Sequence, residues 1–282
     1  VPMYIDTHSK DSMQTSICAY LNTSLEELQK LFDYVSHEAQ QDLYFDAGKA
    51  NALFTDFVQE KIPETPINEI LFFHLSRRLN SSSEPIGNNL YDLLSSSNAT
   101  TCFLKEHDVE LVLEDNHFVI IHKGKKVSLE NSYETNAPYL RWRLGYTKRI
   151  DYCINGFMLK DLLYKNSYAR DLYYAPELIG CLATFLDRPD ICIDYRNNGT
   201  YYCFEYCVPL EDVLFDDSEL LSPQDKELYI LTKVLNRLHD YHTTDPDYIF
   251  DHDNPVIRLA DTATMPSSYC IGKEIITESM LR

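Results

Sequence analysis

The sequence predicts an α+β protein, with a helical N-terminal region at residues 1–66 and a region of strands and helices at residues 67–282. Apolar residues recur at helical spacing before residue 66, a short apolar run comes next, and several short alternating segments follow, separated by turn residues. No internal repeat or linker-like stretch divides the chain. We therefore expect one α+β domain, built on mixed or antiparallel central sheets, with an N-terminal helical subdomain.

Two helices are expected in the N-terminal region. Residues 1–22 are polar and show no clear period, so an irregular lead-in is expected there. Ser24 and Glu27 match a capping box, in which the serine caps a helix and the glutamate returns the hydrogen bond. A second helical pattern covers about residues 49–61, and the prolines that follow end it.

The segment NEILFFHLSRR, residues 68–78, is the centre of the predicted sheet. Its apolar run at 70–73 is short and lies between a proline and a serine-rich tract, which favours a buried strand over a helix. His74 is then expected near the C-terminal end of the strand, and Arg77 and Arg78 are expected to leave the sheet at its edge. A histidine followed by two guanidinium groups suits a ligand that carries phosphate.

The middle of the chain contains the clearest antiparallel signal. Short helices are expected near Leu90 and at 102–107. Turn residues separate three expected strands, at 109–113, 118–122 and 127–129. In PYLRWRLGYT, residues 138–147, arginines alternate with rings and leucines, which predicts a further strand. Residues 151–159 are expected to form another.

The second half of the chain combines helix-start signals with strands. Pro176 and Glu177 begin a predicted helix, and Ser222 begins another that runs to about Tyr241. Two strands are predicted to form a hairpin around a turn at 197–199; they span 191–195 and 200–208. The last predicted strand covers 256–260.

Composition limits the partners and the compartment. With 25 Lys and Arg against 44 Asp and Glu, the formal net charge is −19, and a field of this sign repels nucleic acid and anionic membranes at long range. The charge fits either a basic protein partner or simple solubility. The eight cysteines show no zinc spacing, so no metal site is predicted, and scattered thiols indicate a reducing, cytoplasmic location. No apolar run approaches the length of a membrane span.

Three short stretches carry a resemblance to a known family. FFHLSRR is similar to the histidine-bearing first strand of ADP-ribosyltransferases of the H-Y-E branch. LYYAPELIGCLATFL is similar to the segment in which a tyrosine precedes the helix behind their nicotinamide pocket. PVIRLADTATMPSSY resembles the closing segment of bacterial members. The order of elements over the C-terminal three-quarters of the chain also looks like this fold, so the resemblance implies an ADP-ribosyltransferase-like domain at residues 67–282.

The resemblance implies NAD as a substrate and a set of site residues. His74 would touch NAD, Tyr174 would stack on the nicotinamide, and Asp253 would replace the family glutamate that precedes the final strand; otherwise the transfer chemistry is altered. Arg77 and Arg78 would pair with the pyrophosphate, and Tyr173 is the other candidate for stacking. A carboxylate near the sugar would stabilise the positive charge that develops when the nicotinamide bond breaks. The implied activity is ADP-ribosyl transfer or NAD glycohydrolysis, in an effector or toxin with an unknown acceptor.

A non-enzymatic role fits the same sequence. The charge of −19 and the lack of a decisive catalytic motif suit an acidic module that binds a basic protein or mimics nucleic acid. In that case His74 is a half-buried strand histidine bonded to a carbonyl, and the arginine pair makes surface ion pairs. Glu205, inside the aromatic segment CFEYC, lies either at an exposed edge or in a site that perturbs its acidity.

Overall fold

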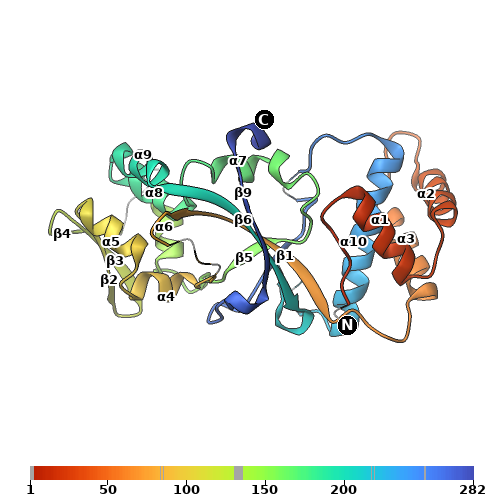
Figure 1. The fold of residues 1–282 in the computed structure, drawn as a ribbon, viewed down its shortest axis with the longest axis horizontal. Coiled ribbons are helices and arrows are strands. Elements are labelled where there is room, and N and C mark those ends of the chain that lie inside the picture. Colours follow the sequence, from red (N-terminus) through yellow and green to blue (C-terminus); the bar gives the residue numbers. More distant parts are fainter. Residues whose placement is uncertain are drawn as a thin grey trace. The chain divides into compact units, whose positions relative to one another are not determined.

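The computed structural model describes residues 3–82, 84, 86–129, 136–216, 218, 220–250 and 252–282, and it has the predicted α+β fold with antiparallel sheets (Figure 1). Six strands form one sheet in the order β7-β8-β5-β1-β6-β9, and three form another in the order β2-β3-β4. The strands of the larger sheet are β1 (Glu69–Leu79), β5 (Asn155–Phe157), β6 (Gly199–Pro209), β7 (Leu214–Phe215), β8 (Val256–Arg258) and β9 (Cys270–Ile275).

The chain divides into two units, and each takes in three separate stretches. Unit 1 comprises Val1–Phe72, Phe157–Lys165 and Cys207–Ile257. Unit 2 comprises Phe73–Gly156, Asn166–Tyr206 and Arg258–Arg282. The regions expected from the sequence, 1–66 and 67–282, were continuous, whereas the division between the units falls inside β1, β5, β6 and β8.

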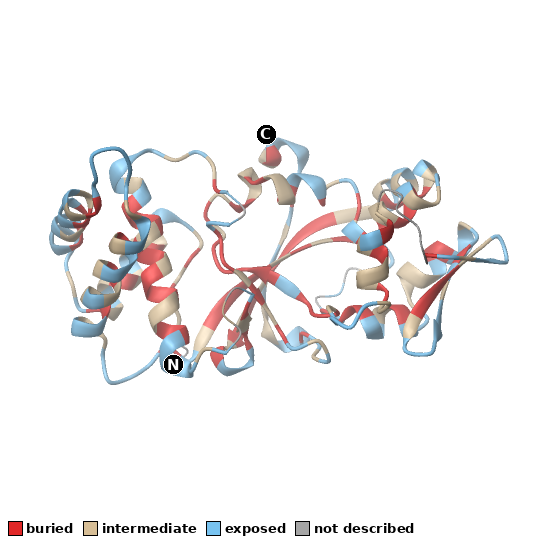
Figure 2. Cartoon of the chain, turned by 180° about the vertical axis from the view of Figure 1, so that it is seen from behind, coloured by how far each residue is buried: buried red, intermediate tan, exposed pale blue. Residues whose placement is uncertain are grey.

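Four helices form the core of unit 1 (Figure 1). The longest is α10 (Pro223–Thr243), which packs against the other three; they are α1 (Lys10–Tyr20), α2 (Leu25–Ala39) and α3 (Ala47–Lys61). The predicted capping box at Ser24 and Glu27 is confirmed. In Figure 2 the buried residues of these helices lie on the faces turned toward one another. Unit 1 also contains the short helices η1 (Leu163–Lys165) and η2 (Leu210–Asp212).

The irregular lead-in expected at residues 1–22 is wrong. Ser9 caps α1 with its own capping box to Ser12. Met13 and Ile17 lie four residues apart and are fully buried, because that spacing places both on one face of a helix. These two residues are the buried positions of α1, and within a largely polar segment they gave too weak a signal to predict a helix.

Unit 2 carries the three-stranded sheet and most of the short helices. The strands β2 (Val109–Glu114), β3 (His117–His122) and β4 (Lys125–Val127) pair antiparallel, close to the expected positions. The helices are α4 (Leu90–Ser95), α5 (Ala99–Glu106), α6 (Ala137–Arg143), α7 (Ser167–Asp171), α8 (Glu177–Phe185), α9 (Pro189–Asn197), η3 (Ser267–Tyr269) and η4 (Glu278–Leu281). One apolar core joins α4, α5, α6, α8 and α9 to the small sheet.

Two predicted strands are helices. Residues 138–147 were predicted as a strand from their alternation, and residues 191–195 from the turn at 197–199 that follows them, yet these segments lie largely in α6 and in α9. In each helix the buried residues are spaced by three or four positions, as with Ala137 and Leu140. Each helix also has a proline in its first turn, a start signal that outweighs alternation over a short stretch.

Strand β1 is longer than expected. It runs to Leu79, so Arg77 and Arg78 lie inside the strand rather than beyond its end. Beyond the last predicted strand the chain forms η3 and then β9, and β9 pairs antiparallel with β6. No helix in the described part of the chain is long and apolar enough to cross a membrane.

Candidate functional site

The side chains of β1 alternate between two faces, and this alternation sorts the predicted site residues. From His74 to Leu79 the burial pattern alternates between half-buried and buried. Successive side chains of a strand point to opposite faces. His74 and Arg78 therefore share one face, and Arg77 lies on the other.

His74 is held as a neutral imidazole. Its Nδ1 lies 2.7 Å from the carbonyl oxygen of Asn155, and because a carbonyl only accepts, Nδ1–H donates and Nε2 carries the lone pair. Burial lowers the pKa of His74 to about 4; the charge of Arg78 lowers it further, and the bond to Asn155 opposes the shift. The expected carbonyl-bonded strand histidine is thus confirmed, and its Nε2 can act only as an acceptor near neutral pH.

On the face of β1 that carries His74, the guanidinium of Arg78 is hydrogen-bonded to backbone carbonyls. Its Nη1 donates to the carbonyls of Glu84 at 2.6 Å and Ile86 at 2.8 Å. Its Cζ lies 4.4 Å from the ring centroid of Phe204 on β6, within cation–π range. The Nη1 group of Arg78 is therefore engaged by two backbone carbonyls.

Arg77 is buried on the opposite face. It donates to three carbonyls, those of Tyr173 at 2.6 Å, Arg196 at 2.9 Å and Gly199 at 3.1 Å. Its Cζ lies 5.2 Å from the Tyr173 ring centroid. These bonds connect β1 to the start of β6 and to the segment before α8. Arg77 therefore uses, in stabilising the fold, the N–H donors that it would need to bind a pyrophosphate.

The two tyrosines lie beside Arg196. Its Cζ is 4.9 Å from the Tyr173 ring and 5.0 Å from the Tyr174 ring. Tyr174 is 59% exposed, and its ring packs edge-on against Tyr173. Tyr173 contacts Arg77, so this aromatic pair lies with the Arg77 face of β1 and away from the face that carries His74.

Geometry therefore does not bring His74 and the tyrosines into one hollow. An imidazole and a ring that bind the same nicotinamide nucleotide must face a common cavity, whereas the alternation of β1 separates them. This separation weighs against the site inferred from the family resemblance.

The last predicted site residue, Asp253, belongs to unit 1. It is exposed, and its Oδ1 lies 3.4 Å from His252 Nε2. The adjacent Asn254 is buried, accepts from the Leu159 N–H and donates to the Leu159 carbonyl. The neighbouring Asp251 lies outside the described residues.

Glu205 does not lie at an exposed edge, because β6 lies between β1 and β9. It is half-buried and pairs in register with Gly272. A Cβ at Gly272 would approach the Glu205 Oε2 to 2.8 Å. The carboxylate thus occupies the space that the glycine leaves.

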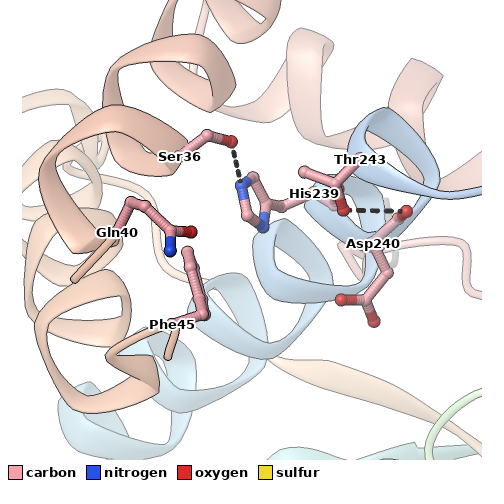
Figure 3. Close-up of a pocket in the computed structure, with 6 residues that line it drawn as sticks. All are labelled: Ser36, Gln40, Phe45, His239, Asp240 and Thr243. Atoms are coloured by element: carbon pink, nitrogen blue, oxygen red, sulfur yellow. Dashed lines mark hydrogen bonds between the residues drawn. The ribbon is translucent and has the colours of Figure 1, made fainter. Parts of the chain in front are cut away.

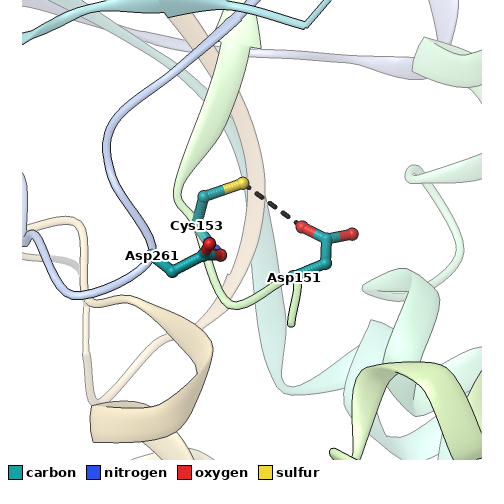
Figure 4. A group of neighbouring side chains, drawn as sticks. All are labelled: Asp151, Cys153 and Asp261. Carbon is teal, nitrogen blue, oxygen red and sulfur yellow. Dashed lines mark hydrogen bonds between the residues drawn. The ribbon is translucent and has the colours of Figure 1, made fainter. Parts of the chain in front are cut away.

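Three potential metal ligands meet in unit 2 (Figure 4). The ligand atoms of Asp151, Cys153 and Asp261 lie within 4.8 Å of one another. Asp151 is already paired with Arg143 at 2.5 Å, and one oxygen of Asp261 accepts from the N–H groups of residues 152 and 153. Burial and the carboxylates raise the pKa of Cys153 to about 12. A protonated thiol among groups that already have partners suits a structural role better than a metal site.

A pocket of about 290 Å³ lies in unit 1 between α2, the turn that follows it and α10 (Figure 3). His239 is buried in its wall, with Nε2 2.8 Å from Ser36 Oγ and its ring stacked on Phe45 at 5.6 Å. Burial lowers the pKa of His239, and His242 adds to the effect, so the imidazole is neutral near neutral pH and shares one hydrogen bond with the Ser36 hydroxyl. The other lining residues are Gln40, Asp240 and Thr243.

Sequence reasoning missed this pocket. Residues 36–45 and 239–243 are about two hundred positions apart, and no spacing rule connects them. The helix that carries His239 was predicted, but the direction of its side chain depends on how α10 packs against α2 and α3.

Charge is divided unequally between the units. Unit 1 contains 25 Asp and Glu against 9 Lys and Arg, a formal net charge of −16. Unit 2 contains the remaining 19 Asp and Glu against 16 Lys and Arg, a net charge of −3. The acidity of the chain therefore belongs almost entirely to unit 1.

Comparisons with family models, with curated proteins and with solved structures gave no match to the chain. The resemblance to ADP-ribosyltransferases therefore stays a prediction, and function has to be argued from the geometry.

Proposed function

We propose that the protein is a non-enzymatic interaction module that binds a basic protein partner through unit 1. The observation that carries this proposal is the charge of −16 on unit 1. If each of its 9 cations neutralised one carboxylate, 16 carboxylates would still lack a cationic partner. A field of this strength attracts cationic surfaces and speeds their association.

The structural roles of the predicted site residues support the same proposal. Arg77 and Arg78 are bonded to carbonyls, and His74 lies on a different face of β1 from the tyrosines. None of the eight cysteines, all in the described part of the chain, forms a disulfide, which suits the reducing cytoplasmic setting that we propose.

Binding to fluorescent poly-L-lysine at increasing salt tests the proposal. We expect tight binding at low ionic strength that weakens steeply with salt, because screening acts on surface charge. A fourfold neutralised variant of unit 1 should bind at least about tenfold more weakly; it carries D11N, D56N, E60Q and E64Q. A matched variant of unit 2 should bind almost as the natural chain does; it carries E106Q, D108N, D115N and D171N.

Equal losses in the two variants would show that net charge alone attracts the polycation, and the proposal for unit 1 would be wrong. Poly-L-glutamate serves as the control polymer, and we expect no binding to it at any salt concentration.

ADP-ribosyl transfer with NAD is the second candidate, favoured by one observation. The neutral His74 presents the Nε2 acceptor that a ribose hydroxyl would need. Thermal unfolding with NAD or nicotinamide tests this candidate, with H74A as the control. Stabilisation by NAD that H74A abolishes would favour the enzyme, and an unchanged unfolding temperature at millimolar ligand would exclude it.

A further inference from the structure

A short turn between α2 and α3 exposes three consecutive large apolar residues. The turn is closed by the bridge between Gln40 and Phe45 and by the bond from the Gln41 N–H to the Tyr44 carbonyl at 2.9 Å. Leu43 is 95% exposed, Tyr44 62% and Phe45 42%. Exposed apolar side chains gathered at one place commonly mark a binding surface.

The same turn forms one wall of the pocket in unit 1. Phe45 stacks on the ring of His239, and Ser36 Oγ is hydrogen-bonded to the Nε2 at the edge of that ring. In Figure 3 Phe45 and Asp240 lie on either side of the His239 ring. Phe45 and Asp240 both line the pocket, together with His239.

The carboxylate of Asp240 is only weakly neutralised. It pairs with Nη1 of Arg237 at 3.6 Å, while Nε of that arginine donates to Asp161 at 2.8 Å, so the charge of Arg237 is shared between two carboxylates. Partial burial raises the pKa of Asp240, Arg237 opposes the shift, and the like charge of Asp253 adds to it. A second cation placed here would relieve the repulsion between the two carboxylates.

We propose that this pocket receives an arginine side chain of the basic partner. The guanidinium would lie against the Phe45 ring and donate to the Asp240 carboxylate, and Leu43 and Tyr44 would contact apolar groups next to that arginine. The inference rests on the proposed function of unit 1 and adds the place and the chemistry of recognition.

Arginine fits this hollow better than lysine does. Its planar guanidinium stacks on an aromatic ring and still offers N–H groups at its edge to a carboxylate. A lysine ammonium is a compact, strongly hydrated charge that would lose water without gaining the stacking contact. The pocket should therefore distinguish two peptides of equal charge.

Fluorescence anisotropy with labelled hexa-arginine and hexa-lysine peptides tests the inference. At one fixed salt concentration we expect the natural chain to bind hexa-arginine about fivefold to tenfold more tightly than hexa-lysine. F45A and D240N should each reduce the affinity for hexa-arginine to near that for hexa-lysine. Two matched controls, Y34A for an exposed ring and D56N for an exposed carboxylate, should leave the preference in place.

The possible outcomes separate this inference from the proposed function. Equal affinity for the two peptides, with equal losses in D240N and D56N, would overturn the arginine pocket and leave the acidic module standing. Failure of both peptides to bind at low salt would overturn the proposed function itself. F45L, which keeps an apolar side chain but removes the ring, should lose the preference for arginine without a change in folding.

Discussion

At the scale of single residues, His74 was predicted to contact a ligand, and in the structure its side chain is hydrogen-bonded to the backbone of a neighbouring strand. The sequence placed an imidazole in a strand, but only the position of β5 provides the Asn155 carbonyl that fixes its tautomer. Burial beside Arg78 then keeps the ring neutral.

The neutral state of His74 predicts a loss of stability in acid. The unfolded chain takes up a proton at this histidine below pH 6.5, whereas the folded chain does so only near pH 4. The free energy of unfolding should therefore fall as the pH decreases from 6.5 to 4, by at most about 3 kcal/mol from this residue, and level off below. Urea unfolding across this range measures the effect.

Two substitutions isolate the contribution of His74. H74Q keeps a donor for the Asn155 carbonyl but cannot titrate, so its stability should depend less on pH between 6.5 and 4. H37Q, at a histidine with a side chain 84% exposed, should leave the pH dependence unchanged. An H74Q profile identical to that of the natural chain would mean that His74 is not protected from protonation.

At the scale of elements, α10 is tied to the stretch 157–165 by a buried ion pair. Arg237 Nε donates to Asp161 Oδ2 at 2.8 Å, and their side chains are 4% and 7% exposed. The Tyr241 hydroxyl also donates to Asp161, at 2.9 Å. The carboxylate is thus fully engaged by groups on α10.

Removing this carboxylate should destabilise unit 1 strongly. D161A leaves the Arg237 guanidinium buried without its main partner, and breaking a buried pair from one side costs about 3–5 kcal/mol. D33A is the matched control, because Asp33 pairs with His242 while its side chain is 75% exposed, and surface pairs contribute about 0–1 kcal/mol. Chemical denaturation of both variants gives the comparison, and similar losses would contradict the role assigned to Asp161.

The junction between α9 and β6 depends on a close approach of backbones at Gly199. A Cβ there would lie 2.8 Å from the Tyr195 carbonyl oxygen and 3.0 Å from that of Arg78. G199A should therefore cost about 1–3 kcal/mol, since neither backbone can move freely. G180A, in α8 with no atom within 4 Å of the new Cβ, should instead stabilise the helix by about 0.5–1 kcal/mol. Thermal unfolding of the two variants should show opposite shifts.

At the scale of the whole molecule, the separation of charge predicts a response to salt. The like charges of unit 1, −16 in total, repel one another in the folded state. Raising sodium chloride from about 20 mM to 300 mM should screen this repulsion and raise the unfolding temperature by a few degrees. The fourfold neutralised variant of unit 1 should gain less, and a salt response equal to that of the natural chain would show that repulsion within unit 1 is not the cause.

Helices and strands were predicted well where residues close together in the sequence are enough to determine them. The capping box at Ser24, the start of α10 at Ser222 and the antiparallel strands near residues 109–127 follow from side chains within a few positions of one another. The error at α6 arose where alternation and helical spacing both fit a short segment, and the error at α9 arose from a turn signal next to a short segment. In both cases the choice depends on which residues the core buries.

The sequence by itself determined the α+β class, most helix starts and the acidity of the chain, because capping, spacing and charge are properties of neighbouring residues. The tertiary structure alone decided that His74 and Arg77 point to opposite faces, that His239 meets Phe45, and that acidity gathers in unit 1. Those facts depend on which distant segments pack together. Contacts between residues far apart in the chain form when whole faces of helices and sheets are buried against one another. The pattern of neighbouring residues does not determine which faces meet.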